Sequence, residues 1–260
     1  MPGDRQRGLF PWWVSFHAEF LESLRNETTV FLAVIQPVVY MTLTLGSTQA
    51  NAGTKASALV GAITMALWST TQWASGSVVS REMTAGTFGG ILSRPTPMLA
   101  VVSMKGLGAS AAGLVLSVPS AVGVALLMGV PMSWRTAGVL VLLAGPAVLC
   151  GTAMGLLLTT LVVVTRAGIR LVSTLTFPML LLGGFLIPAS ALPPYARWFA
   201  DLVPLHWIAD VMSALLVGRA PSIGSVAMLV VLTASYWEIG RRLLAVSVRR
   251  CLTRGELDVR

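Results

Sequence analysis

The sequence predicts an all-α membrane protein with six transmembrane helices. Of its 260 residues, 55% are hydrophobic and only 11% are charged, whereas soluble domains carry about a quarter charged residues. The apolar residues gather in runs long enough to cross a hydrocarbon core of about 30 Å, which takes roughly 20 helical residues. We expect one transmembrane domain over residues 1–260, with an amphipathic segment (1–27), a six-span region (28–247) and a basic tail (248–260).

The chain begins with an aromatic amphipathic segment at residues 11–26. Its apolar residues recur at helical spacing, at Trp13, Phe16, Phe20 and Leu24. Glu19 and Glu22 fall elsewhere on the helical wheel. This pattern is typical of a helix that lies in the membrane interface and is anchored there by aromatic rings. An ordinary packed surface helix is the alternative.

The first two spans are predicted at residues 28–46 and 56–79. Pro37 predicts a kink in the first span, because proline cannot donate to the helical hydrogen-bond ladder. The second span has an unusually polar section, formed by Ser69, Thr70, Thr71, Gln72, Ser75 and Ser77. Polar groups in hydrocarbon need partners, so this section should either pack against another helix or line a substrate path.

A polar island follows at residues 80–97, with Arg81, Glu82 and Arg94 in a chain where charge is scarce. It is too polar to cross a bilayer, so it should form a surface element between the second and third spans. Its residues suit a short docking helix. Glu82 and Thr84 favour a helix start, and Gly86 permits close backbone approach. Phe88, Ile91 and Leu92 offer an apolar face to a groove. A solvated turn without a partner is the alternative.

The remaining spans are predicted at residues 98–128, 136–164, 171–187 and 223–244. The third has a section of small residues where another helix can approach closely: Gly106, Gly108, Ala109, Ala112 and Gly113. In the fourth, Gly151 and Gly155 form a GxxxG pair, which more often serves plain packing than a dimer seam. Four prolines break residues 188–218 into short helices, which we expect to lie at the outer surface or to dip into it.

The distribution of positive charge orients the predicted spans. An even number of spans puts both termini on one side, and arginine and lysine favour the cytoplasm. The segments on that side hold Arg5, Arg7, Arg25, Arg81, Arg94, Lys105, Arg166, Arg170, Arg241, Arg242, Arg249, Arg250, Arg254 and Arg260, against Lys55, Arg135, Arg197 and Arg219 on the other. We therefore expect a plasma-membrane protein with cytoplasmic termini and a cytoplasmic island. The net charge of +8 reflects this orientation rather than a nucleic-acid partner.

Motifs for chemistry within this chain are missing. The sequence has no GxxxxGK[ST] phosphate loop and no HExxH, GxSxG or CxxC. His206 and Asp210 have helical i, i+4 spacing, but two ligands do not make a metal site and a capping or interfacial pair is favoured. Glu238 is expected to form a local ion pair with Arg241 and Arg242. We therefore predict no catalytic, metal or cofactor site, and an energy source in a partner or passive transport.

Two stretches carry a family resemblance. In REMTAGTFGGILSRP (81–95), Glu82, Gly86, Thr87 and Pro95 fall on the characteristic positions of a cytoplasmic pattern between spans two and three. The stretch GGFLIPASALPPYARWFADLVPLHWIADVMSALLVGR (183–219) is similar to the proline-rich segment after span five. With the order of its elements, the chain resembles the permease subunit of an ABC-2 type exporter. It departs from the pattern at Phe88 and Gly89, where a bulky aliphatic residue usually follows Gly-Thr.

The resemblance implies a working unit of two permease chains, identical or related, and two copies of an ABC ATPase that binds ATP and magnesium. A coupling helix would dock in a groove of the ATPase through Arg81, Glu82, Thr84, Gly86, Thr87, Phe88, Ile91 and Leu92, braced by the amino-terminal helix. The substrate path would lie at the seam between the permeases and include Ser69, Gln72, Trp73, Phe177 and Leu181.

The function expected from this resemblance is efflux of a hydrophobic or amphiphilic substrate, such as an antibiotic or a lipid, by alternating access. Three alternatives stay open at this point. The first is an ATP-independent channel or ion-coupled carrier. The second is a polysaccharide-export permease of the same family, and the third is a membrane-embedded enzyme or a scaffold.

Overall fold

The computed structural model describes residues 10–46, 52–71, 73, 81–82, 86, 90, 98–130, 133–165, 174 and 193–254. Within these ranges the regular elements are all helical, as the sequence predicts. The elements, in chain order, are α1 (Phe10–Arg25), α2 (Glu27–Val30), the π-helix η1 (Phe31–Ile35), α3 (Gln36–Gly46), α4 (Ala52–Thr70), α7 (Met98–Leu127), α8 (Trp134–Thr165), α10 (Pro194–Asp201), α11 (Pro204–Val217) and α12 (Ile223–Arg254).

Four of the helical segments are long and apolar enough to cross a membrane: Glu27–Gly46, Met98–Leu127, Trp134–Leu161 and Ile223–Ser247. They agree closely with the predicted first, third, fourth and sixth spans. The apolar helix Ser57–Thr70 covers the first part of the predicted second span. The rest of that span and, apart from Thr174, the predicted fifth span lie outside the described residues, so the six-span topology stays a prediction.

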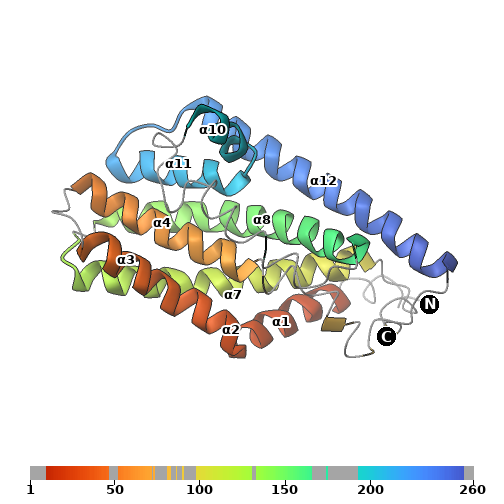
Figure 1. Ribbon diagram of the computed structural model, residues 1–260. Helices are drawn as coiled ribbons and strands as arrows, with labels where there is room; N and C mark the ends of the chain where they lie inside the picture. Colours follow the sequence, from red (N-terminus) through yellow and green to blue (C-terminus); the bar gives the residue numbers. More distant parts are fainter. Residues whose placement is uncertain are drawn as a thin grey trace, which may run out of the picture.

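Antiparallel helices α7 and α8 run through the middle of the bundle (Figure 1). Helix α1 packs along the first half of α7, and α4 contacts α3, α7 and α11. Helix α12 packs along α8 and extends past it toward the end of the bundle where α7 begins (Figure 1). The short helices α10 and α11 confirm that prolines divide this segment, since Pro194 and Pro204 each begin a helix.

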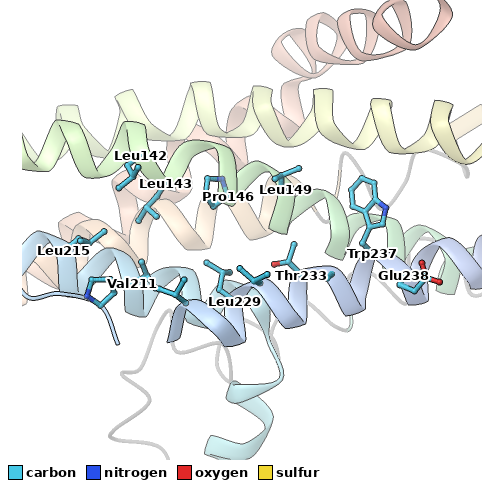
Figure 2. Close-up of a pocket in the computed structure, with 14 residues that line it drawn as sticks. Leu142, Leu143, Pro146, Leu149, Val211, Leu215, Leu229, Thr233, Trp237 and Glu238 are labelled. Atoms are coloured by element: carbon cyan, nitrogen blue, oxygen red, sulfur yellow. The ribbon is translucent and has the colours of Figure 1, made fainter. Parts of the chain in front are cut away.

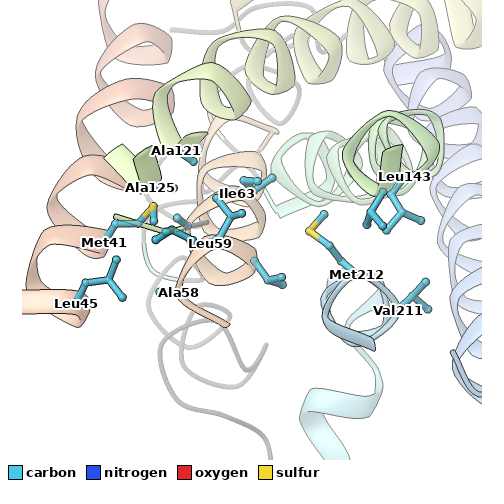
Figure 3. Packing of buried hydrophobic residues seen from close by; sticks show 14 residues of the cluster. Met41, Leu45, Ala58, Leu59, Ile63, Ala121, Ala125, Leu143, Val211 and Met212 are labelled. Carbon is cyan, nitrogen blue, oxygen red and sulfur yellow. The ribbon is translucent and has the colours of Figure 1, made fainter. Parts of the chain in front are cut away.

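The main hydrophobic core lies where α3, α4, α7, α8 and α11 meet (Figure 3). Met41 of α3, Leu59 and Ile63 of α4, Ala125 of α7 and Met212 of α11 are all buried there. Small alanines on α7 let its neighbours approach, and the longer side chains fill the space between them. This packing makes α11 part of the bundle interior rather than a helix resting on its surface.

The backbone is irregular where the first span begins. The Asn26 side chain accepts a hydrogen bond from the backbone amide of Thr29 at 3.1 Å and so caps α2. Figure 1 shows the chain bending here, between α1 and α2. The π-helix η1 then ends at Ile35, directly before Gln36 and Pro37. A π turn next to a proline is a common cause of an irregular helix axis, in keeping with the kink predicted at Pro37.

The small residues of α7 bring helices into close contact, as predicted. A Cβ on Gly108 would lie only 2.5 Å from the carbonyl oxygen of Phe16 in α1, and one on Gly113 would collide with Thr70 Oγ1 in α4. On α8, a Cβ on Gly151 would lie 2.9 Å from Thr71 Oγ1. Gly151 therefore packs within the chain, which agrees with the packing interpretation of its GxxxG pair.

Charged residues at the two ends of the bundle meet different partners. At one end Lys55 donates to the carbonyl of Gly129 at 3.2 Å, and the Arg135 guanidinium lies against Gly218. At the other end Lys105 meets residues of α1 and of the polar island. Lys55 and Arg135 thus lie at the opposite end of the bundle from Lys105, as expected for residues predicted on opposite faces of the membrane. Which of the two faces is cytoplasmic stays a prediction.

Candidate coupling site

Part of the polar face of α1 is turned into the protein. Glu19 is only 1% exposed and Ser23 is equally buried, whereas Trp13 is 65% exposed. The sequence predicted a helix in the membrane interface, with an ordinary packed helix as the alternative. Helix α1 does pack on the protein, because Gly108 admits it against α7 and its carboxylates pair with cations there, while its position in the membrane interface stays a prediction. Of the aromatic stripe, Trp13 is exposed and stacks on Phe16, which is half-buried.

Glu19 joins two cations from different parts of the chain. Its Oε1 accepts from Arg81 Nη2 at 2.5 Å, and its Oε2 lies 3.3 Å from Lys105 Nζ. Arg81 belongs to the polar island and Lys105 to α7. A buried carboxylate is costly unless it is paired and hydrogen-bonded. Both oxygens of Glu19 have a cationic donor, which meets that requirement.

Two further carboxylates complete the cluster. Arg81 Nη1 donates to Glu22 at 2.8 Å, and Lys105 Nζ donates to Glu82 at 2.5 Å. The resulting chain of ion pairs runs Glu22, Arg81, Glu19, Lys105, Glu82. We call these residues the coupling cluster. It fastens the first residues of the island to both α1 and α7, so these elements cannot move apart without breaking charged hydrogen bonds.

The described part of the island includes Arg81, Glu82, Gly86 and Gly90. Gly86 has φ of +71°, a left-handed conformation that glycine adopts readily, and a Cβ there would meet none of the described residues within 4 Å. This conformation is one reason for a glycine here, and the close backbone approach to a partner that the sequence assigned to Gly86 stays a prediction. The other predicted coupling residues lie outside the described residues: Thr84, Thr87, Phe88, Ile91 and Leu92.

Sequence reasoning missed Glu19, Glu22 and Lys105 as members of this site. A signal for them was present. Lys105 is a cation within a long apolar run, and such a residue needs a carboxylate partner. The pairs join residues 62 and 86 positions apart, so only the packing of α1 on α7 reveals which carboxylates are used.

The polar section of α4 lies at helix contacts. Ser69, Thr70 and Thr71 are buried, and Thr70 Oγ1 donates back to the carbonyl of Ala66 at 2.9 Å. Thr70 and Thr71 pack against Gly113 and Gly151. Trp73 is half-buried, and the other predicted path residues, Gln72, Phe177 and Leu181, lie outside the described residues. A role in a substrate path stays a prediction.

The remaining polar residues form local contacts. His206 Nε2 lies 4.0 Å from Asp201, and Asp210 accepts from Ser225 Oγ at 2.5 Å, so the suggested pairing of His206 with Asp210 was wrong. Glu238 does pair with Arg241 and Arg242, as predicted. In the part of the chain that the structure describes, no group of three potential ligands is arranged for a metal ion.

A family model, ABC-2 type transporter, matches residues 11–217. The chain belongs to the ABC-2 type transporter family. This confirms the resemblance seen in the sequence and identifies the chain as a membrane permease of an ABC transporter, a class that works with an ABC ATPase. Comparisons with curated proteins and with solved structures gave no significant match. The matched region of the permease includes every element from α1 to α11, and α12 lies beyond it.

Proposed function

We propose that this permease is the membrane part of an ATP-driven exporter, and that the coupling cluster carries movement from a partner ATPase to the transmembrane helices. The observation that carries the proposal is the ion-pair chain through Glu19. It links the start of the island to α1 and to the first turns of α7. A displacement of the island would therefore be passed to both helices.

The few described residues of the island support different roles for its start and for Gly86. Arg81 and Glu82 are used inside the chain, where they hold the island in place. Gly86 has open space beside it and is available for contact with another protein. We assign the ATPase contact to Gly86 and the residues after it, and the bracing of that contact to the cluster. ATP binding would then favour one arrangement of the helices over another.

The cargo that we propose is hydrophobic or amphiphilic, such as an antibiotic or a lipid, and it would leave the cytoplasm or the inner leaflet. The support is the character of the membrane helices. Their described surfaces are largely apolar, and the buried polar groups in the middle of the described spans are uncharged. Such a surface suits solutes that partition into the bilayer. The working unit would contain two permeases and two ATPases in the plasma membrane.

The test uses the transporter isolated from its native membrane with its ATPase and placed in lipid nanodiscs. Gly86→Trp introduces a bulky side chain at the proposed contact. Gly129→Trp is the matched control, because Gly129 also has positive φ (+67°) and open space beside it, at the opposite end of the bundle. We expect Gly86→Trp to lose substrate-stimulated ATP hydrolysis and co-purification of the ATPase, and Gly129→Trp to keep both.

Equal behaviour of the two glycine variants would contradict the proposed contact, because strain at positive φ is common to both. A second measurement separates driven export from passive transport. The permease alone in liposomes should show no substrate flux, whereas flux without ATPase would favour a channel or an ion-coupled carrier.

A further inference from the structure

An apolar groove of about 780 Å³ runs between α8, α11 and α12. Leu142 and Leu149 of α8 lie across it from Leu215 of α11 and Leu229 of α12 (Figure 2). The groove is open along its side rather than enclosed, and it shares no residue with the coupling cluster. Transport by alternating access does not by itself explain this groove.

The helices around the groove place it at the level of lipid hydrocarbon. Both α8 and α12 contain candidate membrane spans, and only 17% of the span in α12 is buried by the rest of the chain. The lining from Val226 to Glu238 extends over about 18 Å at 1.5 Å per residue. One leaflet contributes about half of a 30 Å hydrocarbon core. The groove therefore has the length and the polarity of a site for one acyl chain.

The polar end of the groove carries excess positive charge. Glu238 lines that end and pairs with both Arg241 and Arg242, so one negative charge faces two positive charges. Arg241 uses Nε and Nη2 for a bidentate pair, whereas Arg242 donates through Nε and is 75% exposed. Guanidinium groups bind phosphate oxygens well, because their planar array of donors matches the phosphate geometry.

We propose that the groove binds one anionic phospholipid, with an acyl chain between α8, α11 and α12 and its phosphate at Arg242. Charge complementarity selects an anionic headgroup over a zwitterionic one, because a zwitterionic lipid leaves the excess positive charge unmatched. Half of the residues that line the site come from α12, which lies outside the region matched by the family model. It is a lipid-binding site in addition to any substrate path.

The test is native mass spectrometry of the full-length permease, delipidated in detergent and titrated with dioleoylphosphatidylglycerol or dioleoylphosphatidylcholine. Val230→Trp fills the groove, since Val230 lines it and is 61% exposed. Val231→Trp is the matched control, because the neighbouring Val231 is 56% exposed and is not part of the lining. Arg242→Gln removes the headgroup contact and leaves the bidentate pair of Glu238 with Arg241.

We expect tighter binding of phosphatidylglycerol than of phosphatidylcholine, loss of the preference in Val230→Trp and retention in Val231→Trp. Arg242→Gln should weaken phosphatidylglycerol binding about fivefold, the usual effect of one basic residue at an anionic lipid surface. Equal binding of the two lipids, or equal binding by the two valine variants, would overturn the proposal. A shift from dimer to monomer in Val230→Trp with unchanged lipid binding would also overturn it, by identifying the groove as a surface between two permeases.

Discussion

Replacing Glu19 with glutamine tests whether the coupling cluster holds α1 to α7. The change keeps the size of the side chain but removes the charge that lies between Arg81 at 2.5 Å and Lys105 at 3.3 Å. Removing one partner of a fully buried ion pair costs about 3–5 kcal/mol. Here each cation keeps a second carboxylate and is partly exposed, so we expect the free energy of unfolding to fall by about 2 kcal/mol.

Glu22→Gln is the matched control for this variant. Glu22 lies on the same helix and pairs with the same arginine at 2.8 Å, but its side chain is 56% exposed. Exposed ion pairs contribute about 0–1 kcal/mol. The loss of about 2 kcal/mol expected for Glu19→Gln corresponds to a fall of roughly 4–8 °C in melting temperature for a chain of this size. Thermal unfolding of the purified permease, followed by tryptophan fluorescence, measures it.

Two results of this comparison would refute the reasoning. If Glu19→Gln and Glu22→Gln lower the melting temperature equally, burial does not set the strength of these pairs. If Glu19→Gln has no effect, α1 is held by packing at Gly108 alone. A double-mutant cycle of Glu19→Gln with Arg81→Gln then measures the interaction energy of this ion pair, because two residues that interact give a non-additive loss of stability.

Two further predictions concern packing and topology. Gly108→Leu should destabilise the permease by about 1–3 kcal/mol, because its Cβ would meet backbone atoms of α1 at 2.5 Å and 3.1 Å. Gly138→Leu should not, because a Cβ on Gly138 would meet none of the described residues within 4 Å. Thermal unfolding compares the two variants. In a Cys251→Ser background, a membrane-impermeant maleimide should label Arg219→Cys in intact cells and should label Gly86→Cys only after the cells are opened. Labelling of Gly86→Cys from outside would place the island on the wrong side for an ATPase.

The positions of the long helices could be predicted from the sequence because a span depends on local properties. The length of an apolar run and the polar residues at its ends define it, and the run at residues 98–128 became a helix at Met98–Leu127. The small residues of α7 and the prolines that begin α10 and α11 were equally informative, because their effects act within a turn of the helix.

The coupling cluster could not be predicted in the same way, because its pairs depend on which helices meet. The helical wheel separated Glu19 from the aromatic stripe of α1, but it could not indicate whether water or protein lay on that side. The structure answers this through Gly108, which brings α1 close enough to α7 for Glu19 to reach Lys105. The lipid groove was missed for a related reason, since leucines on three helices form a groove only when the helices leave space between them.

The length of α12 has a consequence for the region outside the bilayer. Its 32 residues, Ile223–Arg254, correspond to about 48 Å at 1.5 Å per residue, and a tilt of about 20° shortens the projection only slightly. A hydrocarbon core of about 30 Å cannot enclose such a rod. Several of its turns therefore lie beyond the hydrocarbon core, in the headgroup region and at its aqueous edge, where arginines near the carboxyl end suit the helix dipole. The membrane helix thus continues, as one unbroken helix, into a positively charged extension beyond the hydrocarbon core.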